Sequence, residues 1–378
     1  MGMNVAIVGG GPAGSLLAWH LARAGASATV FDPTHPREKP CGGGLTAKSL
    51  ALLPAAPKDD PLPARYVDGC RFDDGPAAVQ VRLARPVAIA SRAELDAWLL
   101  RRATEAGARH EARRVVHVGP DGALRTSDGQ AQAFDTIVGA DGAGSLVRRL
   151  LLGPTPPERL TMAAGWFAGG TSDMQIRFVS DLGGYLWLFP RPDHVGVGIC
   201  APLRGAPTRT LLDRLEAEAR LFFPALADGE RYAHTIPSPS TDPASILEIA
   251  GPRWALVGDA AALADPITGE GIYPALRSAQ VLAETLRERG TPVEYPARLL
   301  EELGRELLCA AALRERFYAP GFTRRMVEYA SRSAAVRDVL RDLVLGEQGY
   351  LGLKKRLMRA GPRFVIENMA SRLRRRAS

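Results

Sequence analysis

A glycine-rich turn between two apolar segments constrains the fold of this chain most strongly. Asn4–Val8 has the composition of a buried β-strand, and Gly9–Gly14 follows it with the spacing G-x-G-x-x-G, directly before a segment of helical periodicity. In this pattern Gly9 permits a tight turn, Gly11 lets the backbone approach a diphosphate, and Gly14 lets the helix pack closely on the strand. Free N–H groups at the start of such a helix attract a diphosphate. The pattern therefore predicts a dinucleotide-binding βαβ unit.

A second strand and an acidic residue fit the same unit. Ala28–Phe31 is apolar, and Asp32 follows it 23 residues after Gly9, where a carboxylate can accept hydrogen bonds from ribose hydroxyls. These features do not distinguish NAD from FAD. A glycine-rich turn without any ligand is the alternative interpretation.

The start of a later helix favours a diphosphate contact. Ser91–Ala106 has a helical apolar stripe, and Ser91 and Glu94 have the spacing of a capping box. This places Arg92 in the first turn, where its guanidinium can reach a diphosphate. An exposed charge at a helix start is the alternative interpretation.

Two further turns favour FAD over NAD. Asp141 and Asp259 each come just after a short apolar strand, Thr136–Gly139 and Ala255–Val257. Asp259 is placed to bind a ribityl hydroxyl, a group that FAD has and NAD lacks. A helix beginning near Gly271 can direct its N-terminal dipole at the flavin edge on which negative charge accumulates during reduction. Each turn alone is typical of a structural role, but their order along the chain predicts a FAD site.

The segments between these motifs predict the rest of the fold. Alternating apolar and polar residues before the last of these strands predict an antiparallel sheet, and from about Gly271 onward the chain has mostly helical patterns. We therefore expect an α/β protein with a discontinuous Rossmann-like FAD-binding domain, an antiparallel-sheet substrate-binding domain and a helical C-terminal region. The expected ranges are 1–60, 92–153 and 251–290 for the FAD-binding domain, 61–91 and 154–250 for the substrate-binding domain, and 291–378 for the C-terminal region.

Two distinctive segments give the chain a family resemblance. Lys39–Leu45 has the sequence K-P-C-G-G-G-L, and Tyr185–Pro190 has the sequence Y-L-W-L-F-P, followed by G-V-G at Gly196–Gly198. Together with the turns above, these segments resemble the geranylgeranyl reductase family within the para-hydroxybenzoate-hydroxylase-type flavoproteins. The resemblance implies a FAD-dependent oxidoreductase. It also implies FAD contacts at Ala13, Asp32, Cys41, Gly42, Gly44, Arg92, Asp259, Gly271 and Ile272.

The same two segments contain the candidate catalytic and substrate-binding residues. Cys41 precedes three glycines, which indicates a backbone in close contact with a flat or phosphorylated ligand. Its thiol either takes part in catalysis beside the flavin or is a small apolar filler. Tyr185, Trp187 and Phe189 alternate and so share one face of a strand, where they suit a long apolar ligand. Ordinary sheet packing is the alternative for the three rings.

The resemblance implies an activity, and two other functions stay open. It implies reduction of C=C bonds in a polyprenyl or other apolar substrate by hydride transfer from the reduced flavin. The sequence has no second G-x-G-x-x-G pattern, so NAD(P)H would bind transiently as the reductant, or another electron donor would serve. A flavin-dependent hydroxylase or halogenase on the same scaffold is the alternative enzyme. A flavin-binding membrane adaptor is the alternative without catalysis.

Positive charge is concentrated at the C-terminal end. The net charge is +7, but the last 25 residues carry +8 and the other 353 residues sum to −1. The near-neutral body lacks the basic stripe of a nucleic-acid-binding domain, so we expect no nucleic-acid partner. Basic and apolar residues are interspersed over 349–376, which is typical of a segment that lies on an anionic membrane surface. A solvated chain end is the alternative.

The spacing of the cysteines and histidines and the length of the apolar runs bear on the cellular location of the protein. The four cysteines lie far apart without a C-x-x-C pair, and the six histidines show no ligand spacing, so we expect neither a disulfide framework nor a metal site. We also find no run of about 18 apolar residues and no secretory leader. We therefore expect a cytoplasmic protein, peripheral at the inner membrane face if the C-terminal segment binds lipid.

Overall fold

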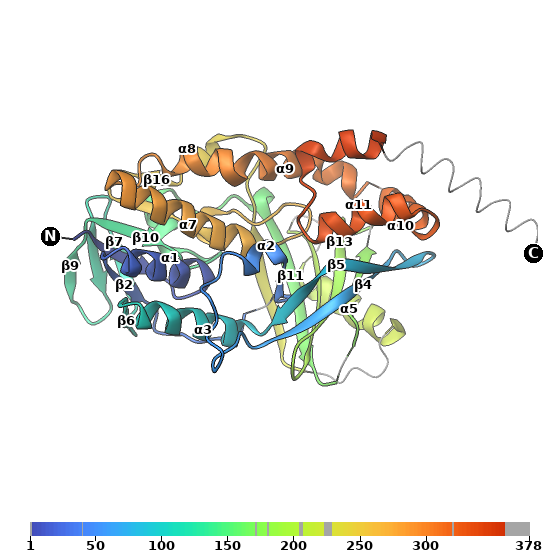
Figure 1. The fold of residues 1–378 in the computed structure, drawn as a ribbon, viewed down its shortest axis with the longest axis horizontal. Helices are drawn as coiled ribbons and strands as arrows, with labels where there is room; N and C mark the ends of the chain where they lie inside the picture. Colours follow the sequence, from blue (N-terminus) through green and yellow to red (C-terminus); the bar gives the residue numbers. More distant parts are fainter. Residues whose placement is uncertain are drawn as a thin grey trace, which may run out of the picture.

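Two large sheets lie one after the other along the long axis of the molecule, and helices run across both of them (Figure 1). The computed structural model describes residues 2–39, 41–170, 172–179, 181–203, 207–222, 229–319 and 321–359. This mixed α/β architecture confirms the expected fold class.

The first sheet is mostly parallel and contains the predicted βαβ unit. In spatial order its strands are β16 (Ala250–Gly251), β17 (Trp254–Leu256), β10 (Thr136–Gly139), β1 (Asn4–Val8), β2 (Ser27–Phe31) and β6 (Arg109–Glu111). All neighbours pair in parallel except β16, which is antiparallel to β17. Continuous apolar runs such as β1 and β10 are buried on both faces, which is why the sequence predicts them well.

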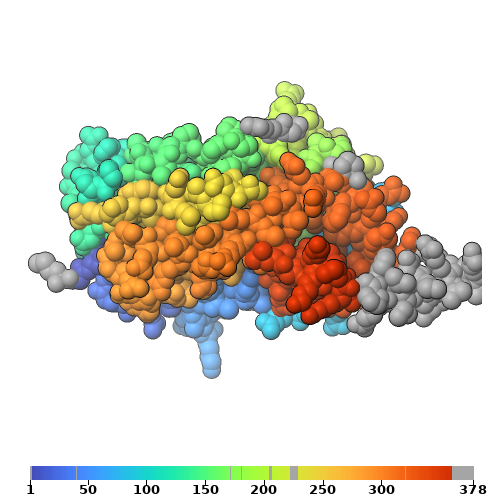
Figure 2. All heavy atoms as spheres, turned by 90° about the horizontal axis from the view of Figure 1, so that it is seen from above, coloured from blue at the N-terminus to red at the C-terminus, as the bar shows by residue number. Residues whose placement is uncertain are grey.

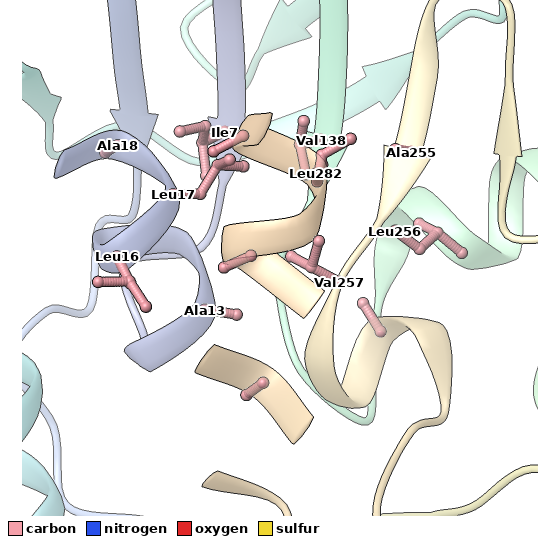
Figure 3. Close-up of a cluster of buried hydrophobic side chains, with 14 of the residues drawn as sticks. Ile7, Ala13, Leu16, Leu17, Ala18, Val138, Ala255, Leu256, Val257 and Leu282 are labelled. Atoms are coloured by element: carbon pink, nitrogen blue, oxygen red, sulfur yellow. The ribbon is translucent and has the colours of Figure 1, made fainter. Parts of the chain in front are cut away.

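Three helices cover this sheet: α1 (Pro12–Arg23), α3 (Arg92–Glu105) and α7 (Ile272–Arg289). Figure 3 shows the buried side chains through which strands and helices meet, among them Ile7 of β1, Leu16 of α1, Val138 of β10, Leu256 of β17 and Leu282 of α7. This core holds the starts of α1 and α7 beside the carboxyl ends of the strands. In open α/β sheets that edge is where ligands bind.

The second sheet has eight strands and comes from the middle of the chain. In spatial order they are β15 (Arg231–Pro237), β11 (Leu160–Ala168), β14 (Val195–Pro202), β13 (Gly184–Pro190), β12 (Gln175–Val179), β4 (Ala64–Asp73), β5 (Ala78–Ala90) and β3 (Gly44–Leu45). The sheet is antiparallel as predicted except that β12 and β4 pair in parallel. These two strands come from stretches of chain separated by the first sheet, so no hairpin dictates their direction. Strand β3 comes from outside the ranges predicted for the substrate-binding domain, and that division stays a prediction.

The two faces of the second sheet meet different parts of the molecule. Leu211 and Leu215 of α5 (Thr208–Phe222) pack on one face, against Leu188 and Val197. On the other face, apolar side chains of β4 and β5 pack against α10 (Phe322–Arg332) and α11 (Ala334–Val344). Because side chains alternate along a strand, odd-numbered residues of β13 point toward the second of these faces.

A small third sheet was not predicted from the sequence. It consists of β7 (Val115–Val118), β8 (Ala123–Thr126) and β9 (Ala131–Ala133), paired antiparallel. Its strands have three or four residues each, too few for a clear alternation. Before α7, the described chain also forms the short helical segments α2 (Ala47–Leu50), α4 (Leu146–Leu151), η1 (Pro157–Arg159), α6 (Ala244–Leu247) and η2 (Gly258–Ala261).

The described part of the chain after α7 is mostly helical, as predicted. It forms α8 (Tyr295–Leu299), the π-helical η3 (Leu300–Gly304), α9 (Arg305–Phe317), α10, α11 and a further helix over 350–359. Figure 2 shows these segments, orange to red, lying side by side along much of one face of the molecule. Within the described ranges, no helix has both the length and the apolar character that crossing a membrane requires. Most of the predicted membrane-binding segment, 360–376, lies outside the described residues.

Candidate active site

One cavity between the two sheets brings most of the predicted site residues together. Its walls come from the turn after β1, the loop before β3, the start of α3, strand β13 and the chain between β17 and α7. The predicted residues that line it are Gly11, Ala13, Cys41, Gly42, Gly44, Arg92, Tyr185, Trp187, Phe189, Asp259, Gly271 and Ile272.

Three of the predicted residues do not line the cavity but shape the glycine turn: Gly9, Gly14 and Asp32. A Cβ atom on Gly14 would lie 2.0 Å from the carbonyl oxygen of Gly9, so only glycine allows α1 to start this close to β1. The Asp32 carboxylate accepts hydrogen bonds from the amides of Gly10 and Thr34, both at 2.9 Å. Burial alone would raise the pKa of Asp32, but these hydrogen bonds lower it. A contact of Asp32 with ribose therefore stays a prediction.

The start of α1 and a buried guanidinium make an anion-binding corner. Among the described residues no side chain caps the first turn of α1, whose N-cap is Gly11, so its amides can bind a ligand. Arg92 and Asp96 are both more than nine-tenths buried and form two hydrogen bonds of 2.8 and 2.9 Å. A terminal nitrogen of Arg92 lies 3.7 Å from the position of a Cβ on Gly11. This arrangement suits a diphosphate.

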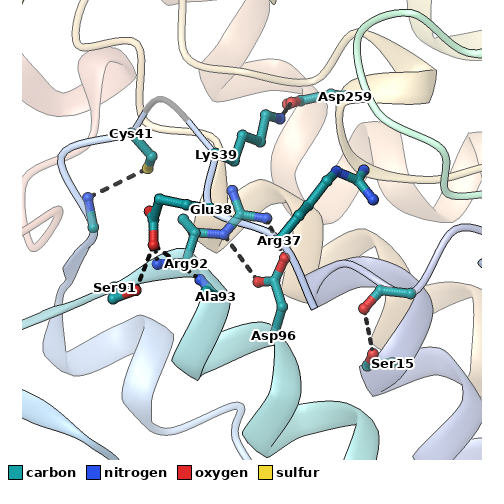
Figure 4. A network of polar contacts seen from close by, with 12 residues as sticks. Ser15, Arg37, Glu38, Lys39, Cys41, Ser91, Arg92, Ala93, Asp96 and Asp259 are labelled. Atoms are coloured by element: carbon teal, nitrogen blue, oxygen red, sulfur yellow. Dashed lines mark hydrogen bonds and ion pairs between the residues drawn. The ribbon is translucent and has the colours of Figure 1, made fainter. Parts of the chain in front are cut away.

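The predicted capping box at the start of α3 is wrong. The Ser91 hydroxyl donates to Glu38, and the same carboxylate accepts from the amides of Arg92 and Ala93 at 3.1 and 3.2 Å (Figure 4). Glu38 therefore caps the helix from a distant loop and accepts from first-turn amides, the role predicted for the Ser91 side chain. Burial would raise the pKa of Glu38, but Arg191 and these donors lower it.

A second ionic contact crosses the cavity at the predicted ribityl site. Lys39 Nζ lies 2.6 Å from Asp259 Oδ2 (Figure 4). Burial alone would raise the pKa of Asp259, but the Lys39 ammonium lowers it below its usual value. The other oxygen of Asp259 lies 3.3 Å from the Cβ position of Gly271, the N-cap of α7. The carboxylate and the start of α7 thus face the same part of the cavity.

Comparison with known proteins settles the family. The model of the FAD binding domain family matches residues 2–219, more than half of the chain. The chain belongs to the FAD-dependent oxidoreductases. It is 30% identical over 369 residues to menaquinone reductase of Mycolicibacterium smegmatis, covering 89% of this chain and 90% of the relative. It is 28% identical over 343 residues to digeranylgeranylglycerophospholipid reductase 2 of Methanopyrus kandleri, covering 81% and 84%.

A solved structure shows the same fold. The geranylgeranyl bacteriochlorophyll reductase-like protein of Thermoplasma acidophilum superposes with a TM-score of 0.78 at 20% identity, over 94% of this chain and 98% of that one. The resemblance to the geranylgeranyl reductase family and the prediction of FAD as cofactor are thereby confirmed.

The lining of the cavity fits FAD in its own right. Trp187 Nε1 and His234 Nε2 are buried polar atoms of the cavity lining that lack a partner among the described residues. Buried polar atoms are normally satisfied, so these atoms indicate a ligand with polar edges. The free start of α1 beside Arg92 suits its diphosphate, and Gly42 and Gly44 also line the cavity.

The far half of the cavity is apolar. Tyr185, Trp187 and Phe189 share one face of β13 and all line the cavity, as their alternation predicts. The remaining apolar lining comes from β4, β5, β12 and the C-terminal helices. It includes Phe72, Val87, Met174, Ile176, Phe178, Phe317, Leu340, Leu343 and Val344.

The two motifs that carry the family resemblance touch each other. A Cβ on Gly42 would lie 2.5 Å from the Phe189 ring, so the glycine turn accommodates the last ring of the aromatic strand. Likewise, a Cβ on Gly198 would lie 2.0 Å from the Trp187 ring. The glycines and the aromatic residues are thus complementary surfaces of one packed unit.

We expect Gly42→Ala to lower the free energy of unfolding by about 1–3 kcal/mol, because the Phe189 ring has to move. Gly44→Ala is the matched control, since its Cβ would lie 3.5 Å from the same ring, an ordinary contact. Urea unfolding of both variants measures the difference. Equal stability of the two variants would show that the contact between the motifs is not tight.

Sequence reasoning missed Arg191, which follows the aromatic motif directly. Its side chain is fully buried and donates to Glu38 at 2.9 Å and to the carbonyl oxygen of Cys41 at 2.7 Å. It also lies over the Phe167 ring, 4.8 Å from the centroid. Arg191 therefore ties the loop that carries Cys41 to the aromatic strand. Its position next to the motif was the only signal in the sequence.

Proposed function

We propose that this FAD-dependent oxidoreductase reduces C=C bonds in a polyprenyl or similar apolar substrate. The observation that carries the proposal is the division of one cavity into a polar half, suited to FAD, and an aromatic half directly beside it. An aromatic-lined cavity of this kind suits a long apolar chain. Relatives named for the reduction of menaquinone and of geranylgeranyl lipids support the same substrate class.

One group of cavity residues would hold FAD, and another group would hold the substrate. FAD, when bound, supplies the hydride, and NAD(P)H or another donor reduces it. The start of α1 and Arg92 would hold the diphosphate, while Asp259 and the start of α7 would hold the ribityl chain and the ring edge. Tyr185, Trp187 and Phe189 would orient the apolar chain.

Cys41 is the proposed catalytic thiol. It lines the cavity, and its Sγ accepts a hydrogen bond from the Gly43 amide at 3.3 Å. Arg191 holds the carbonyl oxygen of the same residue. The thiol is therefore held in place where the polar and the apolar halves meet, and there it would shape the reacting site.

Anaerobic turnover tests the proposal. The purified yellow protein, reduced with dithionite, is mixed with geranylgeranyl diphosphate or with a menaquinone that has an unsaturated side chain, and the product is weighed. We expect a gain of two hydrogen atoms for each bond reduced. Oxygen or halogen in the product of a parallel aerobic reaction with halide would instead support the hydroxylase or halogenase. An unchanged mass with every substrate would support the adaptor.

We further propose contact with an anionic membrane, through which a lipid substrate would arrive. In support, the helix over 350–359 exposes Leu351, Leu357 and Met358 next to Lys354 and Lys355. Apolar and basic side chains on one exposed helix favour an anionic lipid surface. Deleting residues 354–378 should weaken sedimentation with phosphatidylglycerol vesicles at low salt. Unchanged sedimentation would contradict the proposal, and with it a peripheral location.

A further inference from the structure

Glu270 is a carboxyl group of the cavity that lies outside the proposed FAD and substrate contacts. It lines the cavity and directly precedes Gly271, the N-cap of α7. The turn that carries it is fixed from several sides. Tyrosine hydroxyls from three elements donate to it: Tyr185 to the carbonyl oxygen of Thr268, Tyr318 to that of Ile267 at 2.7 Å, and Tyr350 to Asp265 Oδ1 at 3.2 Å.

The two oxygens of this carboxyl group have different surroundings. Oε2 lies 3.7 Å from the Lys48 ammonium, which is too long for a hydrogen bond. Oε1 is buried and has no hydrogen-bond partner among the described residues. A carboxylate oxygen without a donor is costly to bury, so the site favours the protonated acid. Burial accordingly raises the pKa of Glu270, although Lys48 opposes the shift.

The other acids of the cavity are less suited to give up a proton near neutral pH. Asp259 is held as a carboxylate by Lys39. Burial raises the pKa of Tyr185 and of Tyr318 well above the usual value, and both hydroxyls already donate to carbonyl oxygens. Burial lowers the pKa of His234 to about 4, so this ring is neutral at pH 7.

We propose that Glu270 is the acid that protonates the substrate double bond, an inference that rests on the proposed function. The proton bonds to the less substituted alkene carbon through the π electron pair, which leaves a tertiary cation at the other carbon. That cation would accept the hydride that reduced FAD supplies, so the substrate would gain H⁺ and H⁻ and become the alkane, and FADH⁻ would become FAD. Aromatic rings such as Trp187 and Tyr185 stabilise a passing cation.

Lys48 completes the cycle. After the proton has left, Glu270 is a carboxylate, and the nearby ammonium stabilises it until a proton from solvent restores the acid. Lys48 also lies over the Tyr273 ring, 3.9 Å from the centroid, which keeps its side chain near the carboxyl group. A general acid of this kind contributes about 10²–10⁴-fold to a rate.

The test uses Glu270→Gln, with Glu302→Gln as the matched control. Glu302 is a half-exposed carboxylate on η3 that pairs with Arg277. We expect E270Q to bind FAD and be reduced normally, yet to lose at least about 100-fold in the rate at which geranylgeranyl diphosphate reoxidises the flavin anaerobically. E302Q should match the unmodified protein. A normal rate in E270Q, or a loss confined to Cys41→Ala, would overturn the proposal.

A second measurement does not depend on turnover. An infrared titration of the holoenzyme should show a protonated carboxylic acid band that persists above the usual pH range of glutamate and that E270Q lacks, and absence of that difference would overturn the proposal. The unmodified protein could show this band and still reduce neither geranylgeranyl diphosphate nor the menaquinone. That result would contradict the proposed substrate class but would still support a protonated Glu270. The reoxidation rate should fall as pH rises through the raised pKa of Glu270, which is set by burial, Lys48 and Asp265, with Tyr273 and Tyr350 also facing it.

Discussion

A Gly14→Ala variant is expected to be colourless and to lose about 3 kcal/mol of unfolding free energy, the upper end for overpacking a core. The added Cβ would lie 2.0 Å from the Gly9 carbonyl oxygen and 3.1 Å from the Ala140 side chain. Neither neighbour can move alone, so α1 has to shift away from β1. Its free amides then leave the position where we expect them to bind the diphosphate.

Flavin absorbance and urea unfolding measure this effect together. Gly144→Ala is the control, because no atom of the described part of the chain lies within 4 Å of its Cβ position and its backbone is not left-handed. We expect that control to stay within about 0.5 kcal/mol of the unmodified protein. A Gly14→Ala protein that keeps its colour and its stability would contradict the assignment of the turn.

Asp96→Ala is expected to destabilise the FAD-free protein by about 3–5 kcal/mol, because it leaves the buried Arg92 charge without a partner. Both side chains are more than nine-tenths buried and share two hydrogen bonds. Saturating FAD should stabilise this variant more than it stabilises the unmodified protein, since the diphosphate then supplies the missing negative charge. Thermal unfolding with and without FAD measures both effects.

Glu301→Ala is the matched control, since Glu301 and Arg305 form an i,i+4 pair on the helix surface with side chains 58% and 62% exposed. An exposed pair contributes about 0.5 kcal/mol or less. Equal losses in Asp96→Ala and Glu301→Ala would show that the Arg92 pair is not desolvated. If FAD stabilised Asp96→Ala and the unmodified protein against thermal unfolding by the same amount, the diphosphate would lie away from Arg92.

The parts of the fold that follow from local pattern were predictable. The continuous apolar runs of β1 and β10 and the glycine turn after Val8 have few alternative structures, and their bounds agree with the prediction. Helix α3 was also found from its apolar stripe. The cap of α3 was not, because Glu38 lies 53 residues before Ser91 and sequence spacing carries no signal for such a contact.

Most residues of the candidate site were predictable from the sequence, but the contacts between them were not. The alternation of Tyr185, Trp187 and Phe189 predicts a shared face, and the structure brings that face to the glycine turn at Gly42. Arg191 and Glu270 were missed, since a single charged residue beside a motif is usually exposed. Only the packing of distant elements shows that one is buried and that the other lines the cavity.

A crystal structure of the FAD-bound protein tests the central claim most directly. The account predicts that the diphosphate lies at the start of α1 beside Arg92 and that the isoalloxazine ring lies in the cavity that the Cys41–Gly44 turn and the Tyr185–Phe189 face both line. A flavin ring found outside this cavity, with the Tyr185–Phe189 face remote from it, would contradict the account.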